Sequence, residues 1–305
     1  MNENESSLTS LVSAFARAYH SKYDTPPIFD DYIAEKLITQ EEFENIRENM
    51  IKGIQFFNKE LAKIFKDKPD EILKWITQVQ LSPTPLARAA YCENVLFNEL
   101  SLGTKQYVIL GAGLDSFCFR YPELNDSLDI YEVDYPSTQN SKKIRLTNAN
   151  YEIPNNLHFV SMDFTEEFTI QELVEEGFDL NQKTFFSFLG VSYYLTKEEI
   201  ANLINNLLNE VPSGSSIVFD YADEKLFEEK GMSNRVQNML HMTSASGEPM
   251  KSCFTYEEME NLLENAGLLI YEHLPPETIN DQFFNNRTDY LSAFETIHYI
   301  HAVKK

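Results

Sequence analysis

The chain has 305 residues, 43% of them hydrophobic, and its 48 acidic and 25 basic residues give a formal net charge of −23. This apolar content is sufficient for one large core and excludes an intrinsically disordered chain. The negative charge repels polyphosphates and anionic lipids, so the sequence predicts neither a nucleic-acid partner nor a membrane partner.

The cysteines and the first residues indicate the compartment. Cys92, Cys118 and Cys253 are far apart and lack C-x-x-C spacing, so we expect no disulfide framework and no metal site. The start, MNENESSLTS, is polar and acidic, unlike a signal peptide, and no apolar run reaches the length of a membrane-spanning helix. These features predict a cytoplasmic protein.

Residues 1–102 have the pattern of a helical region that caps the rest of the chain. The stretch LTSLVSAFARAYHS carries apolar side chains at helical spacing, with Thr9 and Ser10 available to cap the helix. The prolines of YDTPPIF break the pattern, and helical spacing returns over residues 41–80. A further helix is expected over residues 86–100, after the prolines of SPTP.

Strands alternate with helices over residues 103–305, which predicts a doubly wound α/β domain with its ligand crevice at the carboxyl ends of the strands. Residues 226–252 are long, polar and Met-rich, so we expect either a lid over the acceptor or a surface helix with a loop. Capping boxes are expected at Thr196-Lys-Glu-Glu199 and Thr255-Tyr-Glu-Glu258. The predicted strands are QYVILG, LDIYEVDYP, LHFVSMDF, TFFSFLGVSYYL, SSIVFDYA, LLIYEHL and ETIHYIHAV.

The first strand ends in the glycine loop of VILGAGLDS. Gly111 and Gly113 permit a tight turn and a close approach of the backbone to a ligand. A dinucleotide fingerprint needs a third glycine where this chain has Ser116, and Asp115 beside it opposes a pyrophosphate. The loop therefore favours a ligand without phosphates or with a cationic group, and it argues against an NAD-type oxidoreductase. A plain strand-to-helix turn remains an alternative.

Acidic residues follow at the next two strand ends. Glu132 and Asp134 share one face of the second strand, because side chains alternate with a period of two. Asp134 follows the glycines by about twenty residues, the spacing at which an acid accepts hydrogen bonds from ribose hydroxyls. Asp163 ends the third strand, where it can accept from an adenine amino group while Phe164 covers the ring. Each acid alone fits a solvated strand end, but together with the glycine loop they predict a nucleoside site.

The motifs VILGAGLDS, YEVDYP, SMDF and FLGVSYYLT resemble those of class I S-adenosylmethionine-dependent methyltransferases. More narrowly, the chain is similar to the leucine carboxyl methyltransferase family and its bacterial O-methyltransferase relatives. The segments AFARAYHSKYDTPPIFDDYIAEKLI and TPLARAAYCE also fit, so the resemblance covers most of the chain. It implies S-adenosyl-L-methionine as cofactor and a seven-stranded Rossmann-like methyltransferase sheet, its last strand antiparallel, with an N-terminal helical cap.

The resemblance also implies roles for residues of the glycine loop and the strand ends. Gly111 and Gly113 would pass close to the methionine part of the cofactor. Asp134 would hold the ribose, and Asp163 with Phe164 would hold the adenine.

Two arginines match basic positions of the family. Arg88, in TPLARAAY, would pair with the cofactor carboxylate, which suits the bidentate geometry of a guanidinium. Arg17, in AFARAYHS, would lie near the same carboxylate, although it equally fits an ordinary cation on an amphipathic helix. Leu189-Gly190 stands where eukaryotic members carry a Glu-Cys pair. We place Leu189 in the cofactor site, and the missing carboxylate argues against a phosphatase C-terminus as substrate.

The chemistry implied is an in-line displacement at a sulfonium methyl group, which requires alignment and exclusion of water. A carboxylate nucleophile needs no base, whereas a hydroxyl benefits from one, and the candidates are His241 and Tyr193 or Tyr194. We expect an O-methyltransferase that acts on a small-molecule hydroxyl or carboxylate, such as a polyketide-like metabolite. A protein carboxyl methyltransferase and a non-catalytic cofactor-binding protein are the alternatives.

Overall fold

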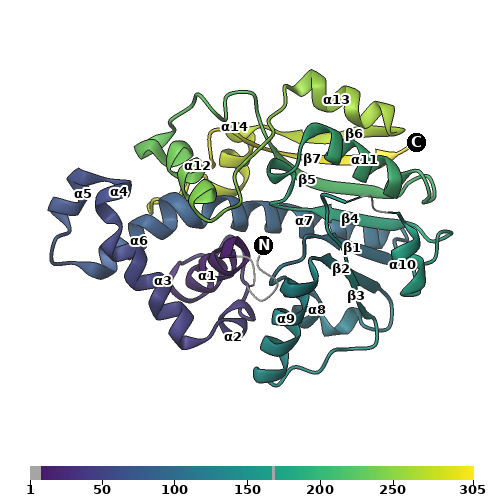
Figure 1. Cartoon of the computed structure of the whole chain (residues 1–305), viewed down its shortest axis with the longest axis horizontal. Coiled ribbons are helices and arrows are strands. Elements are labelled where there is room, and N and C mark those ends of the chain that lie inside the picture. The colour runs from purple at the N-terminus through teal and green to yellow at the C-terminus, as the bar shows by residue number, and fades with distance from the viewer. Residues whose placement is uncertain (1–7, 167–168) are drawn as a thin grey trace.

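A computed structural model of the chain describes residues 8–166 and 169–305. Its centre is a seven-stranded sheet of order β3-β2-β1-β4-β5-β7-β6 (Figure 1). The strands from β1 to β5 pair in parallel, and β7 runs antiparallel to both neighbours, which confirms the predicted Rossmann-like methyltransferase sheet. The strands are β1 (Gln106–Leu110), β2 (Asp129–Asp134), β3 (Leu157–Ser161), β4 (Thr184–Phe188), β5 (Ser216–Ala222), β6 (Leu268–Leu274) and β7 (Ile297–Lys304).

Both faces of the sheet are covered, as the apolar strand sequences require. In β1, Tyr107 and Ile109 point into the core beneath one helical layer, while Val108 and Leu110 point into the core beneath the other. Each such buried side chain contributes roughly 1.5–3 kcal/mol to stability. The first layer contains α7 (Pro83–Ser101), α8 (Phe117–Arg120) and α14 (Pro276–Ile279), and the second contains α10 (Gln171–Glu175), α11 (Lys197–Leu208) and α13 (Tyr256–Asn265).

The helices that precede α7 gather on one side of the sheet around a core of their own (Figure 1). The helical spacing over residues 41–80 is divided into short helices, because Gly53 and Asn58 cap helix ends and Pro69 begins another. The helix expected from residue 86 begins earlier, at Pro83, since proline suits the first turn of a helix. These helices are α1 (Leu8–Tyr23), α2 (Ala34–Leu37), α3 (Gln40–Lys52), α4 (Ile54–Phe57), α5 (Lys59–Ile64) and α6 (Pro69–Ile76), with a π-helical turn over Thr77–Leu81.

An ion pair joins this helical region to the sheet domain. Arg145 lies on α9 (Pro136–Asn148), the helix that follows β2, and its Nη1 and Nη2 donate to the two Glu42 carboxylate oxygens at 2.7 and 2.6 Å. Nη1 also donates to the Leu37 carbonyl at 2.9 Å. Mainly because of the Arg145 hydrogen bonds, the pKa of Glu42 falls to about 2.

The predicted capping boxes are confirmed at Thr196 for α11 and at Thr255 for α13. Between β5 and α13 the chain forms a 3-10 turn over Met232–Asn234 and then α12 (Arg235–Ala245). The buried Arg235 side chain anchors this segment by donating to Glu295 at 2.9 Å. A lid function for residues 226–252 stays a prediction. Within the described residues, no helix combines the length and apolarity needed to cross a membrane.

Candidate cofactor and acceptor site

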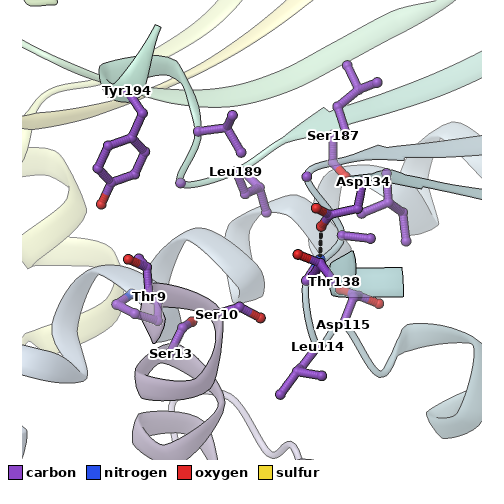
Figure 2. A pocket seen from close by; sticks show the side chains of 18 of the residues that line it. Thr9, Ser10, Ser13, Leu114, Asp115, Asp134, Thr138, Ser187, Leu189 and Tyr194 are labelled. Atoms are coloured by element: carbon purple, nitrogen blue, oxygen red, sulfur yellow. Dashed lines mark hydrogen bonds between the residues drawn. The ribbon is translucent and has the colours of Figure 1, made fainter. Parts of the chain in front are cut away.

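A cavity of about 390 Å³ lies beyond the carboxyl ends of β1 to β4, where the strand order reverses and α/β sheets usually bind ligands (Figure 2). Two parts of the chain enclose it. We call the strand-end side the sheet wall, which comprises residues 111–116, Asp134, Asp163, Phe164 and Leu189. We call the opposite side the roof, which comprises Thr9, Ser10, Ser13 and Arg17 of α1 with Gly247, Glu248 and Pro249 of the loop after α12.

The glycine loop packs too tightly for a side chain at either of its two glycines. Gly111 and Gly113 have φ values of +74° and +53°, in the left-handed region that favours glycine. A Cβ on Gly111 would lie 2.3 Å from Val191, and one on Gly113 would lie 2.6 Å from the Ser10 hydroxyl oxygen. The loop is therefore held between the β4 loop and α1, and its backbone forms part of the cavity surface.

Asp134 closes the glycine loop onto β2. Its two carboxylate oxygens accept from the backbone N–H groups of Gly113 at 2.5 Å and Tyr135 at 2.7 Å. Burial raises the pKa of Asp134, and these two backbone donors oppose that rise. Each oxygen retains a second lone pair, so a carboxylate that lines the cavity can still accept from ribose hydroxyls.

Asp163 and Phe164 line the cavity beyond the end of β3. Asp163 Oδ1 accepts from the Thr165 backbone N–H at 2.9 Å and hydroxyl at 2.7 Å. Within the described residues, Asp163 Oδ2 makes no hydrogen bond. The Phe164 ring lies 6.2 Å from that of Phe188, centroid to centroid. The pair thus offers an acceptor oxygen beside an aromatic face.

Arg88 reaches the cavity from α7 and is held by a buried carboxylate. Its Nη1 donates to Asp220 Oδ2 at 3.0 Å and to the Tyr193 hydroxyl at 2.8 Å, and Asp220 is fully buried. Asp220 Oδ1 also accepts from the Gly190 N–H at 2.6 Å. A Cβ on Gly190 would lie 2.4 Å from Arg88 Nη2, so the guanidinium lies directly against this backbone.

Arg17 also lines the cavity, but protein groups occupy its guanidinium. Nε donates to Asp31 at 2.8 Å, Nη1 to Ser13 at 2.9 Å and Nη2 to the Leu114 carbonyl at 2.7 Å. These contacts fasten the glycine loop to α1. The geometry therefore supports a structural role for Arg17 more than the predicted role beside the cofactor carboxylate.

The two polar residues after the glycines have structural partners. Ser116 is buried and donates to Asp31 at 2.7 Å, and Asp115 Oδ1 accepts from the Phe117 N–H at 2.8 Å at the start of α8. A pyrophosphate at this turn would meet the Asp115 carboxylate, as the sequence predicts.

The predicted acceptor-side residues separate in the structure. Tyr194 lines the cavity with its hydroxyl directed toward Thr9 (Figure 2). Burial raises the pKa of Tyr194 to about 12, so the phenol is a hydrogen-bond donor at neutral pH rather than a base. His241 does not line the cavity; it is exposed on α12, and its ring centroid lies 6.4 Å from that of Phe56. The position of His241 does not support the predicted role as a base, because the periodicity of α12 turns this side chain to solvent.

The roof contains residues that sequence reasoning missed. Thr9 and Ser10 do not precede α1 as caps; they lie in its first turn and face the cavity together with Ser13 (Figure 2). The Thr9 hydroxyl donates to a Glu248 carboxylate oxygen. The recurrence of small polar residues on one face of an otherwise apolar helix is the signal that could have identified this surface.

The side chains of the cavity fit a nucleoside that carries an amino-acid tail. Carboxylates at the strand ends can accept from hydroxyl and amino groups, an arginine suits a carboxylate, and the two glycines let a ligand approach the backbone closely. Among residues 8–166 and 169–305, no cluster of His, Cys, Asp or Glu side chains is arranged to hold a metal ion.

Comparisons with known proteins agree with this chemistry. A family model described as leucine carboxyl methyltransferase matches residues 10–208. YktD of Bacillus subtilis (strain 168), whose name assigns it to the S-adenosyl-L-methionine-dependent methyltransferases, is 68% identical over 305 residues, 100% of each chain. A similarly named protein of Mycobacterium ulcerans (strain Agy99) is 25% identical over 219 residues, 72% of this chain and 66% of that protein. A solved structure of a DUF574 family protein from Streptomyces avermitilis shares the fold, with TM-score 0.54, 14% identity and coverage of 82% and 90%.

Proposed function

Because this chain belongs to the leucine carboxyl methyltransferase family, and so is an S-adenosyl-L-methionine-dependent methyltransferase, we propose that it methylates a hydroxyl or carboxylate oxygen of a small-molecule acceptor. One observation carries the proposal: the cavity is covered by the roof, and its volume of about 390 Å³ is in the range of small-molecule sites.

The residues of the sheet wall fit a single orientation of the bound cofactor. We assign Asp134 to the ribose, Asp163 and Phe164 to the adenine, and the glycine loop to the methionine part. Arg88 is assigned to the cofactor carboxylate, because its Nε and Nη2 make no hydrogen bond within the described residues. When bound, the cofactor supplies an electrophilic methyl group, and the chain aligns the acceptor with it and excludes water.

A protein carboxyl methyltransferase is the second candidate, and the family description favours it. A non-catalytic protein would bind the cofactor and transfer no methyl group to any acceptor. An NAD-type oxidoreductase is excluded, because the family uses S-adenosyl-L-methionine. A cytoplasmic location and the absence of nucleic-acid and membrane partners remain predictions.

A labelling experiment separates the candidates. The purified protein is incubated with methyl-labelled S-adenosyl-L-methionine and a bacterial cell extract, which is then divided into protein and small-molecule fractions. We expect the label in the small-molecule fraction. Label in the protein fraction alone would support the carboxyl methyltransferase, and cofactor binding with no label in either fraction would support the non-catalytic alternative.

A further inference from the structure

We propose that the acceptor presents a neutral hydroxyl group and that Glu248 is the catalytic residue that takes up its proton. The inference rests on the proposed function and narrows it, because it selects the hydroxyl over the carboxylate. It is carried by the charges that line the cavity and by the place of Glu248 in the roof.

Among the described residues, acidic groups outnumber basic groups around the cavity. This excess suits a cofactor with a positive sulfonium and a positive ammonium group, but it opposes a second anion. The lining includes four basic side chains, Arg17, Arg88, Arg120 and Lys251, and six acidic ones, Asp31, Glu93, Asp115, Asp134, Asp163 and Glu248.

Each arginine that lines the cavity already pairs with a carboxylate of the protein. Arg17 pairs with Asp31 at 2.8 Å, and Arg88 pairs with Asp220 at 3.0 Å. Arg120 donates to Glu93 at 3.0 Å.

Neither Arg88 nor Lys251 serves an acceptor carboxylate. Arg88 has nitrogens left within the described residues, and the cofactor carboxylate needs them. Lys251 is exposed at the rim of the cavity, where water and salt screen its charge. A carboxylate acceptor would therefore add a negative charge to a lining in which carboxylates already outnumber cations, whereas a hydroxyl would add none.

Glu248 is placed in the roof by backbone hydrogen bonds on both sides. Its own N–H donates to the Thr243 carbonyl at 2.9 Å, and the Lys251 N–H donates to the Tyr193 carbonyl at 2.6 Å. The side chain accepts from Thr9 of α1. The Glu248 charge contributes to raising the pKa of both Tyr194 and Asp134, so this carboxylate acts across the cavity on both the roof side and the ribose side.

The reaction that follows from this geometry transfers a methyl group to the acceptor and a proton to the protein. The acceptor oxygen forms a bond to the methyl carbon while the bond between that carbon and the sulfonium sulfur breaks, leaving its electron pair on sulfur. The hydroxyl proton moves to a carboxylate oxygen of Glu248. Tyr194, protonated at neutral pH, donates a hydrogen bond that can orient the acceptor.

The alkali stability of the transferred methyl group tests the acceptor class. Small-molecule products from the labelling experiment are treated with mild alkali, which releases a methyl ester as volatile methanol and leaves a methyl ether intact. We expect alkali-stable label attached to oxygen. Label released as methanol would overturn the inference, and so would alkali-stable label that mass spectrometry of the isolated product places on nitrogen or carbon.

The role of Glu248 is tested by Glu248→Gln beside the matched control Glu257→Gln, an exposed glutamate of α13 outside the cavity. We expect Glu248→Gln to lower turnover by roughly 10²–10⁴-fold. Its affinity for S-adenosyl-L-methionine, measured by calorimetry, should fall by no more than about tenfold, because only one partly exposed negative charge beside the cationic cofactor is lost. Wild-type turnover in Glu248→Gln would overturn the role, and if this variant does not fold, Glu248→Asp takes its place with a smaller loss expected.

Failure of the proposed function has a different signature. A wild-type protein that binds the cofactor but transfers no label would contradict the proposed function itself, and with it this inference. Alkali-labile label would leave the proposed function standing and overturn the inference alone.

Discussion

The two sides of the cavity are built in different ways. The sheet wall comes from successive strand ends, and parallel strands bring such ends to one edge whatever their detailed packing. The roof comes from α1 and a loop that follows it by more than two hundred residues, joined by the contact between Thr9 and Glu248. The sheet wall is therefore a consequence of topology, whereas the roof depends on how the helical region packs on the sheet.

This difference suggests a division of labour, with the cofactor on the sheet wall and the acceptor beneath the roof. If the division is correct, changes to the sheet wall should impair cofactor binding far more than changes to the roof.

The largest effect is expected for Asp220, the buried carboxylate that holds Arg88 at the cavity. Asp220→Ala leaves the Arg88 guanidinium without its buried partner, and breaking such a pair costs about 3–5 kcal/mol in the free energy of unfolding. Urea unfolding measures this change, with Asp126→Ala, an exposed aspartate, as the control. A loss no larger than that of the control would mean that Asp220 does not hold Arg88.

The next largest effect is expected for Asp134, which we assign to the ribose. Asp134→Ala removes the acceptor for ribose hydroxyls, and because a hydrogen bond to a charged group contributes about 1.5–3 kcal/mol, two such bonds amount to a loss of at least about 100-fold in cofactor affinity. Isothermal titration with S-adenosyl-L-methionine measures it. Asp129→Ala, at the opposite end of β2, should bind as the wild type does. Equal affinities for both variants would contradict the assignment.

A smaller effect is expected where the helical region joins the sheet domain. Glu42→Gln weakens the bidentate pair with Arg145, and because the Glu42 side chain is 27% exposed, we expect a loss of only about 1–2 kcal/mol in stability.

The same pair predicts a pH dependence. The pKa of Glu42 falls from 4.5 to about 2, so its stabilising contribution is complete above pH 4.5 and is lost as the pH falls toward 2. Stability measured over this range should decline less steeply in Glu42→Gln than in the wild type. Identical slopes would show that the pair does not couple the two regions.

The smallest effect is expected in the roof itself. Thr9→Val keeps the shape of the side chain and removes one hydrogen bond to Glu248. Because both side chains are partly exposed to water, which weakens the interaction, the cost should be only about 0.5–1.5 kcal/mol. Cofactor affinity should change little, whereas the rate of methyl transfer should fall. A large loss of cofactor affinity would show that the roof also belongs to the cofactor site.

The sequence identifies the residues that line the sheet wall better than those that line the roof, for a physical reason. Strand ends such as Asp134 and Asp163 are recognisable because hydrophobic runs and glycines mark the strands locally. Thr9 resembles a helix cap in the sequence, and only tertiary packing turns it toward Glu248. The same limit explains His241, whose position on α12 gave no sign of which helix face would be buried. The partners of Arg17 and Arg88 also lie far along the chain, at Asp31 and Asp220.

The measurement that tests this division most directly is calorimetric titration of S-adenosyl-L-methionine into the wild type, Asp134→Ala and Glu248→Gln. Glu248→Gln should bind the cofactor within about tenfold of the wild-type affinity, and Asp134→Ala should bind it at least about 100-fold more weakly. Equal weakening in both variants, or no weakening in Asp134→Ala, would contradict the assignment of the cofactor to the sheet wall and of the acceptor to the roof.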